Sequence, residues 1–253
     1  MRITGSEAVI RSLLHEDVDT IFGYPGGAIM PVYDALYNFR DKVNHVLVRH
    51  EQGAIHAAQG YARVTGKVGT VIVTSGPGAT NLITGIADAM IDSTPVVCIS
   101  GQVAAALLGS DAFQETDVVG ISMPVTKWNI QVNKAEEIPD AIAKAYYIAR
   151  TGRPGPVLVD ITKNAQFAEL DYEYKPCKYI RSYRPEPPIE PSAIEAAANI
   201  INQARKPYAL VGQGVILGSA EKELQAFLEK ACHRPACPGH HPLTAGHSSL
   251  STD

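Results

Sequence analysis

An acidic residue holds a conspicuous place in the segment VLVRHEQGAIHAAQGYARVTG, residues 46–66. The segment begins with strand-type residues and changes to a helical period at Glu51. Burying a carboxylate without partners is unfavourable. Glu51 is therefore either a partly solvated acid favoured by the helix dipole, which is the commoner case for a single residue, or a group that performs chemistry.

The chemistry that a carboxylate at the end of a buried strand could support is proton exchange with a ring nitrogen of a cofactor. Thiamine diphosphate requires such a group, because protonation at N1′ of its aminopyrimidine produces the imino form that activates the reactive carbon. Glu51 is thus a candidate catalytic and cofactor-binding residue.

Glycine-rich segments follow three of the predicted strands: GYPGGA at residues 23–28, TSGPGATN at 74–81 and SGQ at 100–102. Each also fits an ordinary turn. Adjacent glycines let a backbone approach a ligand, and Gly76-Pro77-Gly78 before a helix resembles an anion-binding nest. The P-loop ending Lys-Ser/Thr and the G-x-G-x-x-G fingerprint are both missing, which argues against nucleotide triphosphates and dinucleotides.

Two further segments carry candidate residues. GSDAFQE, residues 109–115, lies in a long loop, and long loops in compact domains are often functional. Phe113 in this loop could equally be an ordinary residue of the hydrophobic core, whereas Gln114 offers a hydrogen-bond donor and an acceptor in its side-chain amide. TGRPGPVLVD, residues 151–160, contains a common helix-to-strand turn, in which Arg153 could meet a phosphate.

The elements that must position these residues alternate along the chain. Strands are expected over residues 20–23, 43–48, 68–74, 95–100 and 157–160, and helices over 31–39, 52–65, 80–91 and 135–150. A capping box at residues 4–7 opens an earlier helix. This order predicts an α/β fold, a parallel sheet with helices on both faces, whose ligand sites lie at the carboxyl ends of the strands.

The domain organisation changes after residue 163. We predict a first domain over residues 1–163, a Pro- and Tyr-rich linker over 164–190, and the start of a second, truncated α/β domain over 191–230. In that second part we expect a helix with Ser192 as its N-cap and a strand over 208–211. Residues 231–253 hold four of the eight histidines, and we expect a non-native or disordered tail there. A zinc site is the alternative, but the spacing of the ligands fits no standard pattern.

Composition narrows the class of protein. The 253 residues are 45% hydrophobic, with a net charge of −4 and no basic stripe, which argues against nucleic-acid binding. No apolar run is long enough for a membrane span and no signal-peptide core precedes the first helix. Four cysteines do not form a dense disulfide framework, so we expect a cytoplasmic protein.

Six motifs occur in one order: FGYPGGA, RHEQGA, TSGPGATN, SGQV, DAFQET and GRPGPVLVDITK. Over residues 1–230 the chain resembles the N-terminal part of the catalytic large subunits of the acetohydroxyacid synthase (acetolactate synthase) family of thiamine-diphosphate enzymes. The resemblance implies a pyrimidine-binding domain followed by the start of a central FAD-binding domain. It also implies thiamine-dependent decarboxylation of pyruvate and its joining to a second 2-ketoacid, pyruvate or 2-ketobutyrate, for valine, leucine and isoleucine biosynthesis.

The resemblance implies a role for each matching residue. Glu51 would contact N1′ of thiamine diphosphate, Phe113, Gln114 and Lys163 would face the substrate, and Arg153 would contact FAD. The other cofactor-binding residues implied are Tyr24, Pro25, Gly26, Gly27, Thr74, Pro77, Asn81 and Gln114 for thiamine diphosphate, and Gly212, Gln213 and Gly214 for FAD. The family's GDG segment, which binds Mg²⁺ and diphosphate, does not occur here, so no metal ligand is assigned to this chain.

The family's active sites form between two subunits, so the resemblance also implies a homodimer through the pyrimidine domain and, as a further partner, a regulatory small subunit. This fragment alone is expected to be inactive. Two alternatives remain: another thiamine-dependent decarboxylase or oxidase, and a non-catalytic binding module on the same fold. Pyruvate decarboxylase is disfavoured because no His-His pair follows strand 95–100, and DAFQET favours the synthase over pyruvate oxidase.

Overall fold

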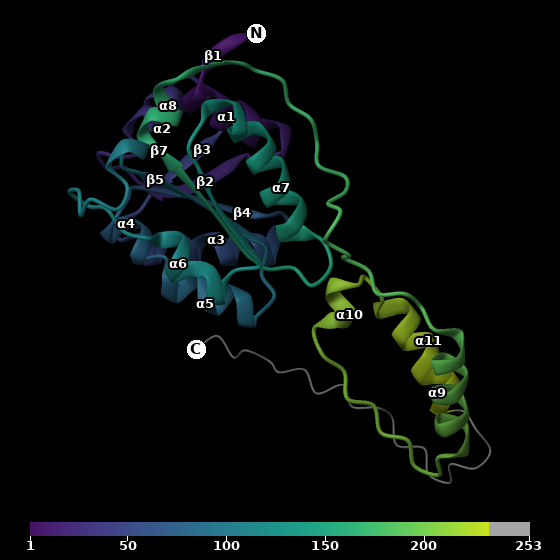
Figure 1. Cartoon of the computed structure of the whole chain (residues 1–253). Coiled ribbons are helices and arrows are strands. Elements are labelled where there is room, and N and C mark those ends of the chain that lie inside the picture. Colours follow the sequence, from purple (N-terminus) through teal and green to yellow (C-terminus); the bar gives the residue numbers. More distant parts are fainter. Residues whose placement is uncertain (233–253) are drawn as a thin grey trace. The chain divides into compact units, whose positions relative to one another are not determined.

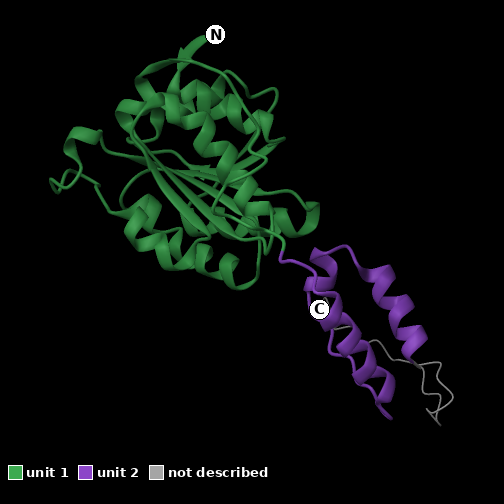
Figure 2. Cartoon of the chain, turned by 45° about the vertical axis from the view of Figure 1, so that its right-hand side comes forward, with its two compact units in different colours: residues 1–186 green, residues 187–253 purple. Residues whose placement is uncertain are grey.

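The computed structural model describes residues 1–232, which fall into two compact units. Unit 1 comprises residues 1–186, and unit 2 begins at Pro187 (Figure 2). Each unit is described by itself.

Unit 1 is built on a six-stranded sheet in the order β3-β2-β4-β5-β7-β6, and every neighbouring pair is parallel. The central strands are buried on both faces, as their runs of Val and Ile require. The predicted α/β class and parallel sheet are therefore confirmed. The strands, in spatial order, are β3 (Asn44–Leu47), β2 (Thr20–Tyr24), β4 (Gly69–Val73), β5 (Val96–Gln102), β7 (Pro156–Thr162) and β6 (Trp128–Val132).

Helices cover both faces of this sheet (Figure 1). The helices form two groups, one on each face, and an apolar cluster lies beneath each group. The cluster beneath the first group includes Ile10, Ile142 and Tyr146, and the cluster beneath the second includes Ile55 and Ile86. The first group consists of α1 (Gly5–His15), α2 (Met30–Tyr37), α7 (Ile138–Arg150) and α8 (Lys163–Phe167); the second consists of α3 (Glu51–Thr65), α4 (Pro77–Thr80), α5 (Ile83–Ile91) and α6 (Val118–Ser122). Short 3₁₀ turns at Ala105–Leu107, Met123–Val125 and Ala135–Glu137 complete the unit.

The chain stays with unit 1 beyond the end that the sequence predicts. After β7 and α8, strand β8 (Glu169–Asp171) pairs antiparallel with β1 (Arg2–Thr4), so that Leu170 lies opposite Ile3. The extended segment that follows is attached at Tyr183, whose hydroxyl donates to the Thr151 carbonyl at 2.7 Å. The first compact unit ends at Glu186 instead of residue 163, and most of the predicted linker over 164–190 belongs to it.

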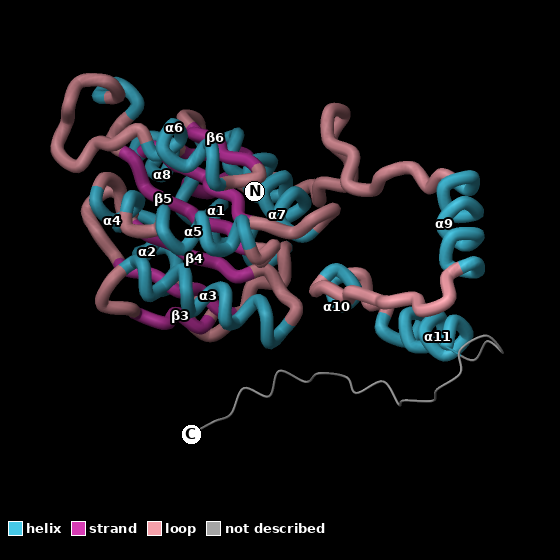
Figure 3. The backbone as a smooth tube through the Cα atoms, turned by 90° about the horizontal axis from the view of Figure 1, so that it is seen from below, coloured by secondary structure: helices cyan, strands magenta, loops and turns pink. Residues whose placement is uncertain are grey.

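Unit 2 contains α9 (Pro191–Gln203), α10 (Gly214–Leu217) and α11 (Glu221–Cys232), and within the described range up to residue 232 it contains no strand (Figure 3). The prediction of a strand over 208–211 is wrong, because these residues pair with no strand of the described chain. The first helix begins at Pro191 with Glu190 as its N-cap, so the predicted cap at Ser192 is wrong too. The expectations for the tail, including the zinc alternative, lie outside the described residues from 233 onward.

Candidate active site

Glu51 is the first residue of α3 and lies at the carboxyl edge of the sheet, shortly after β3. His50 caps the helix, because its Nδ1 accepts a hydrogen bond from the Gln52 amide at 3.1 Å. The Glu51 residue is only 8% exposed, and the Asn81 side-chain amide donates to its Oε2 at 2.9 Å. Glu51 is thus a buried carboxylate that accepts a hydrogen bond from Asn81, and not a solvated acid in the first turn of a helix.

The TSGPGATN turn lies against this carboxylate. A Cβ atom added to Gly78 would lie 2.7 Å from Thr74 Cγ2 and 3.3 Å from Glu51 Oε1, so glycine is needed for this close approach. Gly76 has a φ of 57°, in the left-handed region that glycine favours, and Pro77 begins α4 with its side chain at the surface. The turn therefore brings Gly78 close to both Thr74 and the Glu51 carboxylate, and Asn81 at its end bonds the other carboxylate oxygen.

The GYPGGA loop is fastened to the same turn. The Ala28 amide donates to Thr74 Oγ1 at 3.2 Å, and Gln166 Nε2 donates to the Ala28 carbonyl at 2.8 Å. A Cβ on Gly26 would lie 2.5 Å from Thr74 Cβ, so this loop and the Thr74 turn are in direct contact. The remaining residues of the predicted loop site, Tyr24, Pro25 and Gly27, are exposed at the carboxyl edge. Gln166, which is fully buried on α8, belongs to none of the motifs of the sequence.

Tyr33 is a second neighbour that sequence analysis missed. Its hydroxyl donates to the Ile72 carbonyl at 3.0 Å, next to the backbone of Gly23. Burial and, to a lesser degree, the negative charge of Glu51 raise the pKa of the Tyr33 hydroxyl. Tyr33 thus remains a neutral donor near the carboxylate, and its place one helical turn inside α2 gave no motif by which to find it.

The long loop after β5 reaches this region as well. A Cβ on Gly76 would lie 2.7 Å from the Gln114 carbonyl oxygen, so the Gln114 backbone rests on the turn beside Glu51. Phe113 is 88% exposed, and Lys163 is exposed at the start of α8, after β7 ends. The fold thus brings Gln114 to the turn beside Glu51, with Phe113 next to it in sequence, and puts Lys163 at the same edge of the sheet.

Residues 3–121 match the family described as thiamine pyrophosphate enzyme, N-terminal TPP binding domain. This part of the chain is similar to that TPP binding domain. The match spans Glu51, the three glycine-rich turns and the loop that carries Gln114.

Curated relatives match a longer stretch of the chain. It is 57% identical over 228 residues to the acetolactate synthase large subunit of Corynebacterium glutamicum, covering 90% of this chain and 36% of the relative. It is 50% identical over 231 residues to the acetolactate synthase large subunit of Haemophilus influenzae, covering 90% of this chain and 40% of the relative. It is 46% identical over 254 residues to a probable acetolactate synthase large subunit of Methanocaldococcus jannaschii, covering 96% and 42%. The chain spans about two fifths of the length of these relatives.

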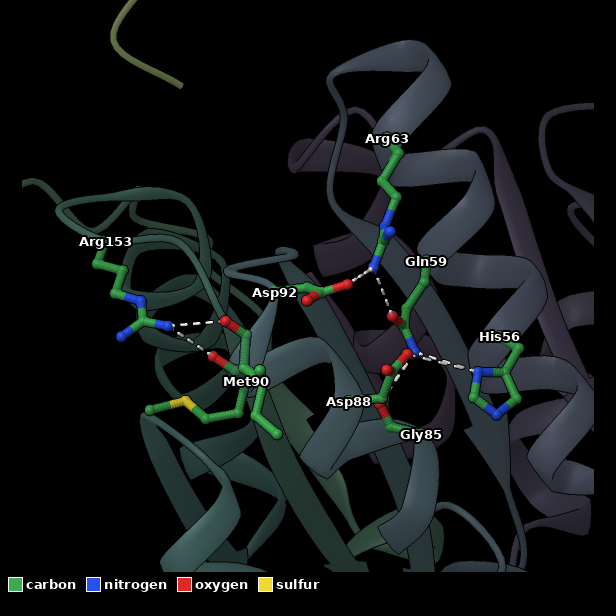
Figure 4. Close-up of polar contacts among 9 residues, drawn as sticks. His56, Gln59, Arg63, Gly85, Asp88, Met90, Asp92 and Arg153 are labelled. Atoms are coloured by element: carbon green, nitrogen blue, oxygen red, sulfur yellow. Dashed lines mark hydrogen bonds and ion pairs between the residues drawn. The ribbon is translucent and has the colours of Figure 1, made fainter. Parts of the chain in front are cut away.

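Of the residues predicted to bind FAD, only Arg153 belongs to the same compact unit as Glu51. Arg153 precedes β7 and so lies at the amino edge of the sheet, where its guanidinium donates to Ser93 Oγ at 2.7 Å. It also donates to the carbonyls of Met90 and Ile91 at 3.2 and 2.8 Å (Figure 4). It thereby caps the end of α5. Gly212, Gln213 and Gly214 lie in unit 2, where Gly214 begins α10.

No group of three or more His, Cys, Asp or Glu side chains that could hold a metal ion occurs among residues 1–232. Within the same residues, none of the helices has the length and apolar character needed to cross a membrane.

Proposed function

We propose that this chain forms the pyrimidine-binding part of an acetolactate synthase that uses thiamine diphosphate. The enzyme would decarboxylate pyruvate and join the product to a second 2-ketoacid, pyruvate or 2-ketobutyrate, in valine, leucine and isoleucine biosynthesis. The observation that carries the proposal is the buried Glu51 carboxylate, bonded to Asn81 beside a glycine turn, within a TPP binding domain.

The residues present suit the cofactor's aminopyrimidine. When bound, thiamine diphosphate supplies the carbon nucleophile that attacks the ketoacid carbonyl, and it needs a proton link at its pyrimidine ring. Glu51 would provide this link, because its Oε2 is fixed by Asn81 while its Oε1 faces Gly78. The absence of a side chain at Gly78 keeps this oxygen approachable, and the burial of Glu51 excludes water from the proton exchange.

The remaining cofactor and substrate residues are proposed from their place on the same edge. Tyr24, Pro25, Gly26 and Gly27 would line the cofactor on one side, and Thr74, Pro77 and Gln114 on the other. Phe113 and Lys163, both exposed here, would face the 2-ketoacid. An exposed cation such as Lys163 suits an approaching carboxylate substrate.

Two other cofactors are proposed on the family resemblance. Mg²⁺ would be held with the diphosphate by residues outside this chain. FAD would be bound through Arg153, Gly212, Gln213 and Gly214; Arg153 already serves α5, and its role toward FAD would be additional to that.

Partners and location follow from the same proposal. The first domain would form a homodimer, and because relatives are named large subunits, a regulatory small subunit is a further proposed partner. We also propose a cytoplasmic location; Cys98 and Cys177 both carry free thiols, which fits a reducing compartment.

A chimeric enzyme tests the function. Residues 1–186 of this chain would replace the aligned part of the Corynebacterium glutamicum large subunit, which is the relative 57% identical to it. We expect the chimera to form acetolactate from pyruvate only when thiamine diphosphate and Mg²⁺ are supplied, and the 253-residue chain alone to form none. A folded chimera that releases acetaldehyde instead would indicate a thiamine-dependent decarboxylase. A folded chimera without any turnover of pyruvate would contradict the proposal.

A further inference from the structure

A carboxylate outside the Glu51 site is buried at the same edge of the sheet. Asp160 of β7 is fully buried and accepts hydrogen bonds from three neutral side chains. Ser100 Oγ donates to its Oδ1 at 2.7 Å, and Gln102 Nε2 and Gln131 Nε2 donate to its Oδ2 at 3.0 and 3.2 Å. These donors offset part of the cost of burying the charge, and they join β5, β7 and β6.

Gln102, the last residue of β5 and of the SGQ motif, connects this carboxylate to the loop of residues 103–117. Its Nε2 also donates to the Thr116 carbonyl at 2.9 Å, and its Oε1 accepts from the Val103 amide at 2.9 Å. One side chain therefore ties both ends of the loop to Asp160. The side chain must keep one orientation, because exchanging its amide oxygen and nitrogen would lose all three bonds.

The loop held in this way is irregular. Gly109, Asp111 and Gln114 have φ values of 77°, 56° and 58°. The Glu115 carboxylate accepts hydrogen bonds from the backbone amides of Gly109 and Ala112, which holds residues 109–115 together as a turn. These two contacts lie within the loop, whereas two other bonds fasten the loop to the rest of the fold. Near its start the Ala105 amide donates to Asn164 Oδ1 at 2.7 Å, and near its end, close to Gln114, Gln102 Nε2 donates to the Thr116 carbonyl. The Gln114 backbone that rests on Gly76 is only two residues from that anchor.

We propose that Gln102, oriented by Asp160, is a positioning residue that holds the 103–117 loop against the turn beside Glu51. Through it, Gln114 and Phe113 are presented to the proposed thiamine site. The catalytic meaning of this contact rests on the proposed function, but the order of the loop is a property of the chain itself. It can therefore be tested on the 253-residue protein without any assay of activity.

The test is hydrogen–deuterium exchange with a matched pair of substitutions. Gln102→Met and Gln131→Met each remove an amide donor to the same Asp160 oxygen, but only Gln102 contacts the loop. We expect Gln102→Met to speed exchange of the loop amides about tenfold or more relative to those of the β5 core, and Gln131→Met to change the same ratio by less than about twofold. An equal change in both variants, or an unchanged loop in Gln102→Met, overturns the proposal.

A measurement on the unaltered protein decides the matter if Gln102→Met does not fold. The two side-chain amide protons of Gln102 are expected to exchange slowly and to show NMR cross-relaxation with Thr116. Exchange at the rate of a free glutamine amide would overturn the proposal. These readouts separate the two hypotheses: an inactive chimera with a correctly anchored loop would count against the function, and an active chimera with an unanchored loop would count against the positioning role.

Discussion

Buried carboxylates at the carboxyl edge of the sheet are bonded to neutral groups, whereas carboxylates at the amino edge pair with cations. There, Glu16 has a buried side chain and pairs with Arg150, and two further pairs are exposed. At the carboxyl edge, Glu51 and Asp160 are bonded to neutral amides and hydroxyls. The exposed pairs of the amino edge are Asp19 with Lys67, and Arg63 with Asp92 at 2.6 Å, the second of which is drawn in Figure 4. About half of each of these side chains is exposed.

This difference distinguishes the edge of the sheet that carries the proposed function from the edge whose polar contacts serve only the fold. A buried carboxylate without a cation destabilises a protein unless its donors are well placed, and nothing in packing requires one there. Exposed ion pairs contribute little stability and are easily replaced. The carboxyl edge is therefore where substitutions should affect activity and pH dependence, and the exposed ion pairs of the amino edge are where they should be nearly silent.

The largest effect is expected from Glu51→Gln in the chimeric enzyme. It keeps the shape and a contact with Asn81 but removes the exchangeable proton, so kcat should fall by about a hundred- to ten-thousand-fold. Glu7→Gln is the matched control, because Glu7 also lies in the first turn of a helix but pairs with Arg11 at the surface. Equal activity of the two variants would remove the special role of the carboxyl edge.

Asp160 should give the largest effect on pH-dependent stability. Burial raises the pKa of its carboxyl to about 6 from 3.8, so the native state holds the proton more tightly than the unfolded state does. Its contribution is fully present below about pH 4 and is lost as the pH rises to about 6, a change on the order of 3 kcal/mol.

Urea unfolding from pH 4 to 7 would measure this effect, with Asp160→Asn as the reference. Asparagine can still accept from the two glutamine amides and donate to Ser100. The difference in unfolding free energy between the two proteins should therefore decline across this window. A difference independent of pH would show that the pKa of this carboxyl is the same in the native and unfolded states.

A third prediction concerns the contact between the two glycine turns. Gly26→Ala places a Cβ 2.5 Å from Thr74 Cβ, and Thr74 is held by the Ala28 amide. We expect a loss of about 1–3 kcal/mol in the free energy of unfolding. Gly27→Ala is the control at the adjacent position, since its added methyl has nothing within 4 Å. Similar midpoints in urea for both variants would mean that the turns are not in contact.

The smallest effect is expected at the amino edge, from Asp19→Asn. Hydrogen bonds from Lys67 and then from Tyr61 lower the pKa of Asp19 to about 2, so its contribution is present above about pH 4 and is lost as the pH falls. The sign is opposite to that of Asp160. Because the pair is half exposed, we expect at most about 1 kcal/mol at neutral pH, decreasing with added salt. A loss larger than that of Gly26→Ala would break the contrast between the edges.

The sequence predicted most of the sheet because its central strands are continuous runs of β-branched residues. It missed β6, in which Asn129 and Gln131 interrupt the apolar pattern at the edge of the sheet. It also missed β1 and β8, which are only three residues long and exist because they pair with each other. The strand predicted over 208–211 fails for the converse reason, since β-type residues alone do not form a strand without a partner.

The candidate site was predictable where motifs are local. Glu51, Thr74 and Asn81 do converge, because the carboxyl ends of parallel strands share one edge. Tyr33 and Gln166 reach the same edge through helices whose sequences follow ordinary core patterns, and only their tertiary contacts reveal them. Arg153, a conspicuous charge in a Gly-Pro turn, lies at the opposite edge of the sheet, and its role toward FAD stays a prediction.

The pairing of β1 with β8 gives the domain a particular order of assembly. Ile3 is synthesised before most of the domain, but it can pair with Leu170 only after nearly the whole domain has left the ribosome. Until then, the residues ahead of α1 have no partner strand, and the sheet must form without them. Completion of this small ribbon would thus mark the moment when the nascent domain closes.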